Sequence, residues 1–215
     1  MWPDAEQTQE LLAHAREGQT AAINQLLDRH REALRRMVDL RMDRALRQRV
    51  DASDIVQDAL VEANRRLPDY LEHPQMPFQL WLRQIAKDRL IDAHRRHRVA
   101  ARRSVDREQP LVARSALDHS TLDLAAQLCD RQLTPAAAAT RHELAQRFQA
   151  SLDELDENDR EVILLRHFEQ LSNQETAQAL GLSEPAAGMR YLRAVRRLRA
   201  LLNETSSEND SESNG

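Results

Sequence analysis

Apolar residues recur every three to four positions along most of this chain, and this spacing predicts amphipathic helices almost throughout. Three such segments open the sequence, over residues 8–16, 20–47 and 52–67. Asp51 or Ser53 is a suitable N-cap for the third segment. The residues predicted to form the buried face of that segment are Ile55, Val56, Ala59, Leu60 and Ala63.

A further helical pattern covers residues 78–99, after the turn-rich stretch DYLEHPQMP, in which Pro74 and Pro77 interrupt any helix. The residues predicted to point inward from this helix are Leu80, Trp81, Ile85, Leu90 and Ile91. The other side is predicted to be exposed and basic, with Arg83, Lys87, Arg89, Arg95, Arg96 and Arg98.

The pattern weakens between residues 100 and 134, where small and polar residues dominate, and we interpret this stretch as a linker. Helical spacing resumes over residues 136–155, and Asp156 then caps a helix with an apolar run ending at Phe168. After Asn203 the sequence is acidic, rich in serine and without apolar residues, which predicts disorder.

These patterns predict an all-α fold of two small helical domains joined by a flexible linker. The expected boundaries are 1–99 for the first domain, 100–134 for the linker, 135–203 for the second domain and 204–215 for the disordered acidic tail. The four glycines and the aromatic content of 3% also favour helices over strands.

The segment from Leu171 to Arg199 has the pattern of two short helices joined by a tight turn. Ser172 and Glu175 have the spacing of a capping box, and Gly181 can end the first helix in a left-handed turn. Ser183 can cap the second helix, whose first turn tolerates Pro185. This is the pattern of a helix-turn-helix unit, whose second helix enters the major groove of DNA.

The second of these helices has an apolar side and a basic side. Residues expected to face a core are Leu192, Val195, Leu198 and Leu202. Arginines that can reach phosphates or guanine edges are Arg190, Arg193, Arg196, Arg197 and Arg199. Arginine-rich amphipathic helices after a glycine turn also occur in bundles that bind no nucleic acid, so the helix alone leaves both interpretations open.

Charge and composition limit the class of protein further. The net charge of −4 conceals basic stretches between an acidic N-terminal segment and the acidic tail. Cys129 is the single cysteine, so an intramolecular disulfide is excluded and a reducing compartment is favoured. No apolar run approaches the length of a membrane span, and the N-terminus lacks the pattern of a signal peptide. We therefore expect a cytoplasmic protein without membrane insertion.

Three motifs occur in a fixed order along the chain. They are DASDIVQDAL at 51–60, WLRQIAKDRLIDAHRR at 81–96 and LDENDREVILLRHFEQLSNQETAQALGLS at 155–183. Together they resemble the extracytoplasmic-function (ECF) subfamily of bacterial RNA polymerase sigma factors, within the sigma-70 family, and the resemblance covers most of the chain. It implies an adaptor that binds core RNA polymerase and directs promoter-specific initiation, with no enzymatic activity and no cofactor or metal.

The resemblance also assigns roles to particular residues. Asp54, Gln57 and Asp58 would contact the clamp helices of the polymerase largest subunit. The helix with Lys87, Arg95 and Arg96 would meet the downstream promoter element and help to open it. Because separated strands need a pocket and a positive groove, the loop 73–77 is a further candidate for this step. Residues that would bind the upstream element are Ser183, Arg190, Arg193, Arg196 and Arg197, and which arginines read bases and which bind phosphates stays open.

Two features near these motifs have alternative interpretations. Trp81 could stack on an unpaired base, although its spacing with Leu80 and Ile85 favours a place in the core. In the recognition helix Gly188 stands where the family usually has lysine, which removes one potential DNA contact and costs about 1 kcal/mol of helix stability relative to alanine.

Three other classes of protein compete with the sigma-factor hypothesis. A stand-alone helix-turn-helix regulator explains residues 171–199 but not the first domain, and a sigma-like interaction module would only sequester partners. An enzyme could use His94 and His97 near Asp88 and Asp92 as metal ligands, but the chain lacks the usual hydrolase motifs.

A sigma factor with exposed polymerase-binding and DNA-binding faces would be active constitutively unless another protein covered them. We therefore expect an anti-sigma or other inhibitory protein as a further partner. The acidic tail from Glu204 is a candidate shield of the basic recognition helix.

Overall fold

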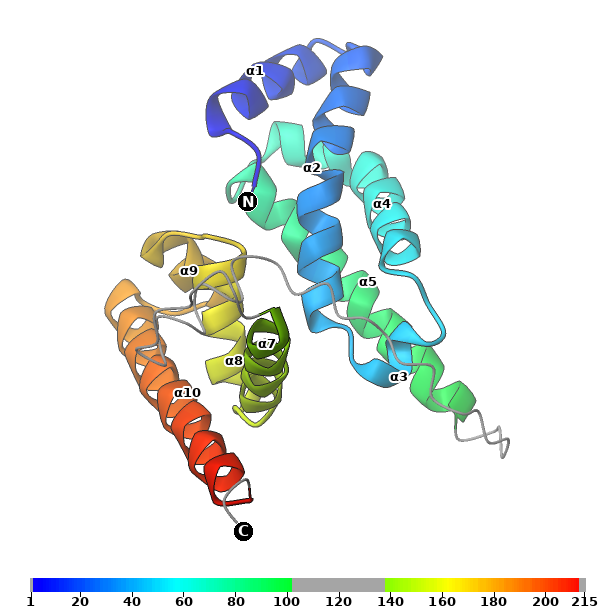
Figure 1. The fold of residues 1–215 in the computed structure, drawn as a ribbon. Coiled ribbons are helices and arrows are strands. Elements are labelled where there is room, and N and C mark those ends of the chain that lie inside the picture. The colour runs from blue at the N-terminus through cyan, green and yellow to red at the C-terminus, as the bar shows by residue number, and fades with distance from the viewer. Residues whose placement is uncertain (1, 102–137, 213–215) are drawn as a thin grey trace. The chain divides into compact units, whose positions relative to one another are not determined.

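The computed structural model describes residues 2–101 and 138–212, and within these two ranges its regular structure is helical, without strands (Figure 1). The chain divides into two compact units, Met1–Arg114 and Ser115–Gly215. An all-α fold of two helical domains is therefore confirmed. Most of the predicted linker, from residue 102 on, lies outside the described residues.

The first unit contains α1 (Ala5–Arg16), α2 (Thr20–Arg41), α3 (Arg44–Arg47), α4 (Ala52–Glu72) and α5 (Phe78–Ala101). Helices α2, α4 and α5 pack against one another, and α1 packs against α2 and α4 (Figure 1). Their shared core is aliphatic over most of its length and becomes aromatic near the start of α5. Fully buried members include Leu26, Leu34, Met37, Leu67, Phe78 and Leu82.

Helix α4 forms largely as its sequence predicts. The Asp51 carboxylate accepts a hydrogen bond of 2.7 Å from the Ser53 backbone N–H, and the predicted apolar face from Ile55 to Ala63 is buried. The helix runs to Glu72, however, past the predicted end near Leu67 and through Pro68. Tyr70 is buried in the core, so its packing holds the last turn in spite of the backbone hydrogen bond that proline removes.

Helix α5 corrects two predictions. Its buried stripe runs through Phe78, Leu82, Ile85, Ala86, Leu90 and Ala93. Ile91, predicted to point inward, lies beside this stripe and is 53% exposed. Arg83, predicted to be exposed, is 3% exposed, because it follows the buried Leu80 by three residues and shares that flank of the helix.

The second unit contains α7 (Ala138–Asp153), α8 (Glu157–Ile163), the π-helical turn η1 (Leu164–Phe168), α9 (Asn173–Leu180) and α10 (Glu184–Glu212). Helix α10 packs against α7, α8 and α9 (Figure 1). The fully buried side chains at this junction include Phe148, Leu152, Val162, Ile163, Leu198 and Leu202. The core of this unit therefore depends on α10, the helix that also has the arginines.

Helix α10 departs from its prediction at two places. Leu192, predicted to face the core, is 47% exposed, because the buried side of the helix passes through Ala187, Ala194 and Leu198. The helix also continues to Glu212, whereas the sequence predicts a disordered tail from residue 204. Once a helix is formed, each further residue adds a backbone hydrogen bond, which explains how it extends into a polar segment.

Candidate functional site

The outer side of α4 brings together the three residues predicted to contact polymerase. Asp54, Gln57 and Asp58 are all exposed, on the side of the helix opposite the buried Val56 and Ala63. Val61 extends the same side by one turn and is 66% exposed. Sequence reasoning missed Val61, although its spacing of three and four residues from Asp58 and Gln57 placed it on their face.

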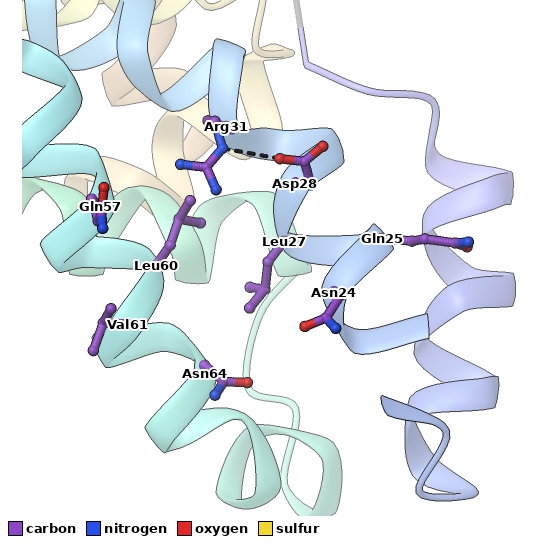
Figure 2. Close-up of a pocket in the computed structure, with 9 residues that line it drawn as sticks. All are labelled: Asn24, Gln25, Leu27, Asp28, Arg31, Gln57, Leu60, Val61 and Asn64. Atoms are coloured by element: carbon purple, nitrogen blue, oxygen red, sulfur yellow. Dashed lines mark hydrogen bonds and ion pairs between the residues drawn. The ribbon is translucent and has the colours of Figure 1, made fainter. Parts of the chain in front are cut away.

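A groove lies beside this surface, between α2 and α4, with a volume of about 670 Å³ (Figure 2). Three apolar side chains, Leu27, Leu60 and Val61, line it. Its polar lining residues are Asn24, Gln25, Asp28, Arg31, Gln57 and Asn64. The Arg31 guanidinium donates to the Asp28 carboxylate at 3.0 Å, so these two charges at the groove are paired with each other. The site combines apolar surface with amide groups that are able to donate and accept hydrogen bonds.

Two of the three basic residues assigned to DNA on α5, Arg95 and Arg96, lie in its last two turns and both contact Asp92. Arg95 is exposed and its Nη2 lies 3.4 Å from Asp92 Oδ1, whereas the Arg96 Nε donates to the Asp92 backbone carbonyl at 3.4 Å. Lys87 is half-buried. An exposed ion pair contributes little to stability, so Arg95 exchanges Asp92 for another partner at little cost. Arg96 is also exposed, and both arginines are accessible to phosphates.

The loop between α4 and α5 is anchored by an aromatic cluster. The Tyr70 hydroxyl donates to the Met76 carbonyl at 2.9 Å, and the Tyr70 ring stacks on Trp81 with centroids 4.6 Å apart. Phe78 packs 5.5 Å from both rings. Burial raises the pKa of Tyr70. Trp81 is partly buried and packs on the core, which agrees with its predicted core position, whereas sequence reasoning did not single out Tyr70.

The predicted helix-turn-helix geometry is present at α9 and α10. Ser172 Oγ accepts from the Glu175 N–H at 3.1 Å, and Glu175 Oε2 accepts from the Ser172 N–H at 2.8 Å, which completes the capping box. Gly181 ends α9 with φ +64°, in the left-handed region. Ser183 Oγ then accepts from the Ala186 N–H at 3.4 Å at the start of α10. The Asn173 side chain donates to the Glu184 carbonyl at 2.9 Å and ties the two helices together.

The exposed surface of α10, over the residues whose side chains are described, combines arginines with two large apolar side chains. Arg193, Arg196 and Arg197 are exposed and Arg190 is half-buried, so all four predicted DNA contacts lie within one stretch of helix. Exposed apolar residues on this helix are Met189, at 64%, and Leu192, at 47%.

One of these arginines has a fixed partner. Arg193 Nη2 lies 3.1 Å from Oδ1 of the buried Asp159, a contact that raises the pKa of Arg193. This pair joins α8 to α10, and the sequence gives no sign of it because 34 residues separate its members.

The histidines considered as metal ligands have other surroundings. His94 Nδ1 lies 3.6 Å from Asp43 Oδ2, at the N-cap of α3. Within the described ranges, no three His, Cys, Asp or Glu side chains are grouped closely enough to hold a metal ion. Among the described helices, none is long and apolar enough to cross a membrane.

The first unit has an exposed groove between α2 and α4, and the second has a helix-turn-helix, the fold of a class of DNA-binding proteins. Comparison with known families gives two matches, one in each of these units. Residues 22–99 match the family model of sigma-70 region 2, and residues 145–198 match that of sigma-70 region 4.

Full-length relatives lead to the same family. The chain is 34% identical over 203 residues to the RNA polymerase sigma factor CnrH of Cupriavidus metallidurans, covering 92% of this chain and 95% of the relative. It is 28% identical over 199 residues to the ECF RNA polymerase sigma factor SigD of Mycobacterium tuberculosis, covering 93% and 85%. The chain belongs to the ECF subfamily of the sigma-70 family of RNA polymerase sigma factors. It therefore binds core RNA polymerase and directs promoter-specific transcription initiation.

Solved structures agree with this assignment. CnrH in complex with the cytosolic domain of CnrY superposes with a TM-score of 0.58 at 29% identity, covering 94% of this chain and 99% of that one. The sigma factor RpoE in complex with the anti-sigma factor NepR, from Bartonella quintana, gives a TM-score of 0.52 at 21% identity, covering 80% and 91%. At 21% identity, the similarity to RpoE shows the fold alone.

Proposed function

We propose that the sigma factor docks on the clamp helices of the polymerase largest subunit through Asp54, Gln57 and Asp58 on α4, together with the α2–α4 groove. The observation that carries this proposal is the exposed Val61 beside Gln57 at that groove. A large aliphatic side chain that is two-thirds exposed gains free energy when a partner removes it from water.

The shape and chemistry of the groove suit a helix as the occupant. Grooves between two helices commonly accept the apolar face of a third helix, and Leu27, Leu60 and Val61 supply apolar contacts for it. Asp54 and Asp58 lie one turn apart beside the groove and favour a partner with basic side chains. Gln57 lines the groove itself and is able to fix the register of the partner by hydrogen bonds.

The same unit would bind the downstream promoter element and help to open it. Lys87, Arg95 and Arg96 supply positive charge for the phosphates, and the anchored loop 73–77 lies at the other end of α5. Separated strands are held by a basic surface together with pockets or stacking surfaces for unpaired bases. Tyr70 supports this role because its hydroxyl fixes the backbone of the loop at Met76.

The second unit would bind the upstream element through the recognition helix α10. Ser183 caps that helix at its N-terminal end, which is the end that enters the major groove in helix-turn-helix proteins. Arg190, Arg193, Arg196 and Arg197 follow on it and supply contacts to bases and phosphates. We place the two domains at residues 1–99 and 135–203, with the regions 22–99 and 145–198 inside them.

The protein would act without catalytic groups or a cofactor, in the cytoplasm, where its polymerase partner works. We also propose that an anti-sigma protein restrains it. The support is that the related CnrH and RpoE were solved in complexes with CnrY and NepR, respectively, and NepR is an anti-sigma factor. A protein bound at the α2–α4 groove would exclude polymerase directly.

A transcription assay tests the proposed activity. Core RNA polymerase that lacks any sigma factor is mixed with the purified full chain and with genomic DNA fragments, and the 5′ ends of new transcripts are mapped. We expect a limited set of start sites that share two upstream sequence elements. Transcription no more specific than that of core polymerase alone would contradict the proposal.

A further inference from the structure

Of the four arginines assigned to DNA on α10, Arg193 differs from the others by its ion pair. Its Nη2 lies 3.1 Å from Asp159 Oδ1, and this is the one ion pair that Arg190, Arg193, Arg196 and Arg197 make with the described residues. The Arg193 side chain is nonetheless 66% exposed. Its guanidinium is therefore held at one edge and accessible at the others.

Asp159 is well suited to hold that guanidinium. It lies in the first turn of α8, where the positive end of the helix dipole stabilises a carboxylate, and its side chain is 6% exposed. Its backbone N–H donates to Asp156 Oδ1 at 3.0 Å, which fixes the position of the turn. A buried carboxylate requires a partner, so the free energy of the folded domain favours the pair.

An arginine whose guanidinium is oriented by a carboxylate and an arginine without such a partner suit different contacts with DNA. Bidentate recognition of guanine O6 and N7 needs the guanidinium in one orientation, and an arginine already oriented loses less side-chain entropy on binding. Phosphate binding accepts many orientations, and a neighbouring carboxylate weakens it by partly neutralising the positive charge.

We propose that Asp159 is a positioning residue that fixes Arg193 as the guanine-reading arginine of the recognition helix, while Arg196 and Arg197 bind phosphates. Asp159 itself does not touch DNA. This inference rests on the proposed function, because it requires α10 to enter the major groove. It assigns the roles of three arginines that the sequence leaves open.

Holoenzymes reconstituted from core polymerase and the full chain test the proposal. They select from a duplex DNA library that is randomised over the upstream element, and the bound sequences are counted. The wild type is expected to enrich a motif with a guanine at one position. Asp159→Asn should lower the preference for that guanine by about fivefold or more, since a good bidentate contact discriminates by roughly 1–3 kcal/mol, and should leave the other positions unchanged.

Arg196→Ala is the matched control on the same helix. It is expected to weaken binding to all sequences and to lower the slope of log K against log salt by about 1, with the motif retained. Loss of the same guanine preference in Arg196→Ala and in Asp159→Asn would overturn the assignment of separate roles.

Failure of the proposed function and failure of this inference give different results. A wild type that enriches no sequence contradicts the proposed function itself, whereas a wild-type motif that Asp159→Asn leaves intact contradicts this inference alone. The circular dichroism spectrum and the thermal unfolding curve show whether Asp159→Asn is folded. Arg193→Lys changes only the exposed member of the pair and must lose the same guanine, because lysine cannot form the bidentate contact; retention of the guanine would again overturn the inference.

Discussion

Replacement of Tyr70 by phenylalanine removes one oxygen atom from the support of the loop 73–77. The hydroxyl donates to the Met76 carbonyl at 2.9 Å, and no other contact of the aromatic cluster depends on it. The phenylalanine ring can keep the stacking contact with Trp81 and the edge contact with Phe78. The substitution therefore isolates the hydrogen bond that fixes the loop.

The size of the effect follows from that bond. An intramolecular hydrogen bond contributes about 0.5–1.5 kcal/mol net. Met76 is half-buried as a residue, so we take the middle of this range. A loss of about 1 kcal/mol corresponds to a roughly fivefold smaller population of the ordered loop. It should also lower the melting temperature of the first unit by about 4–8 °C, the usual shift for a domain of this size.

Promoter opening gives the functional readout. Permanganate reactivity of unpaired thymines reports strand separation in the holoenzyme complex, and we expect a several-fold slower rise of reactivity for Tyr70→Phe with unchanged polymerase binding. Tyr191→Phe is the matched control, because it removes a hydroxyl that lies 2.7 Å from His167 Nε2 in the second unit. Normal opening by Tyr70→Phe, or an equal opening defect in both variants, would refute the role of the loop.

Other substitutions give independent tests. His30 is buried, and burial lowers its pKa from the ordinary value of 6.5. Below about pH 6.5 the unfolded chain therefore binds more protons than the folded chain, and the free energy of unfolding should fall. Urea unfolding at pH 7.5 and 5.5 should show this fall, and His30→Leu should make it smaller. Ser172→Ala breaks the capping box and should lower the stability of the second unit by about 1 kcal/mol in thermal unfolding, with upstream DNA affinity reduced and polymerase affinity retained; an unchanged melting curve would contradict this. Gly181→Ala places a side chain at φ +64° and should destabilise the second unit by about 1 kcal/mol. Gly188→Ala lies within α10, with its new Cβ at an ordinary 3.6 Å from Asn173, and should stabilise the same unit by roughly 0.5–1 kcal/mol. Melting temperatures of the two variants that move in the same direction would contradict this pair of predictions.

Local chemistry explains which features the sequence predicts well. The caps at Asp51, Ser172 and Ser183 and the left-handed Gly181 depend on residues within three positions of one another, so their hydrogen bonds follow from the sequence alone. The apolar face of α4 is also predicted, because one wide stripe on a single helix leaves little choice of orientation.

Errors arise where neighbouring helices decide which flank is covered. Ile91 and Leu192 lie just outside the buried side of their helices and Arg83 lies just inside it, and periodicity alone does not say which flank the adjacent helix covers. Helix α4 runs past its predicted end at Leu67 because the packing of Tyr70 outweighs the backbone donor that Pro68 lacks.

The candidate sites depend still more on tertiary structure. The motif predicts Asp54, Gln57 and Asp58 as one surface, but the groove beside Gln57 also requires Leu27 from α2, and no sequence spacing places these two helices together. The pairing of Asp159 with Arg193 likewise arises from the packing of α8 on α10. The assigned contacts with polymerase and DNA remain predictions from the motifs and their geometry.

Docking on polymerase through α4 is the central claim, and co-elution on a size-exclusion column tests it most directly. The wild type, Gln57→Ala, Asp58→Arg and Glu10→Arg are each mixed with core polymerase that lacks sigma factor. Glu10→Arg makes the same charge change as Asp58→Arg at an exposed position of α1, outside the groove lining. We expect the wild type and Glu10→Arg to co-elute, and Gln57→Ala and Asp58→Arg to lose co-elution while their circular dichroism spectra stay unchanged. Co-elution of Asp58→Arg equal to that of Glu10→Arg would contradict the proposed docking surface.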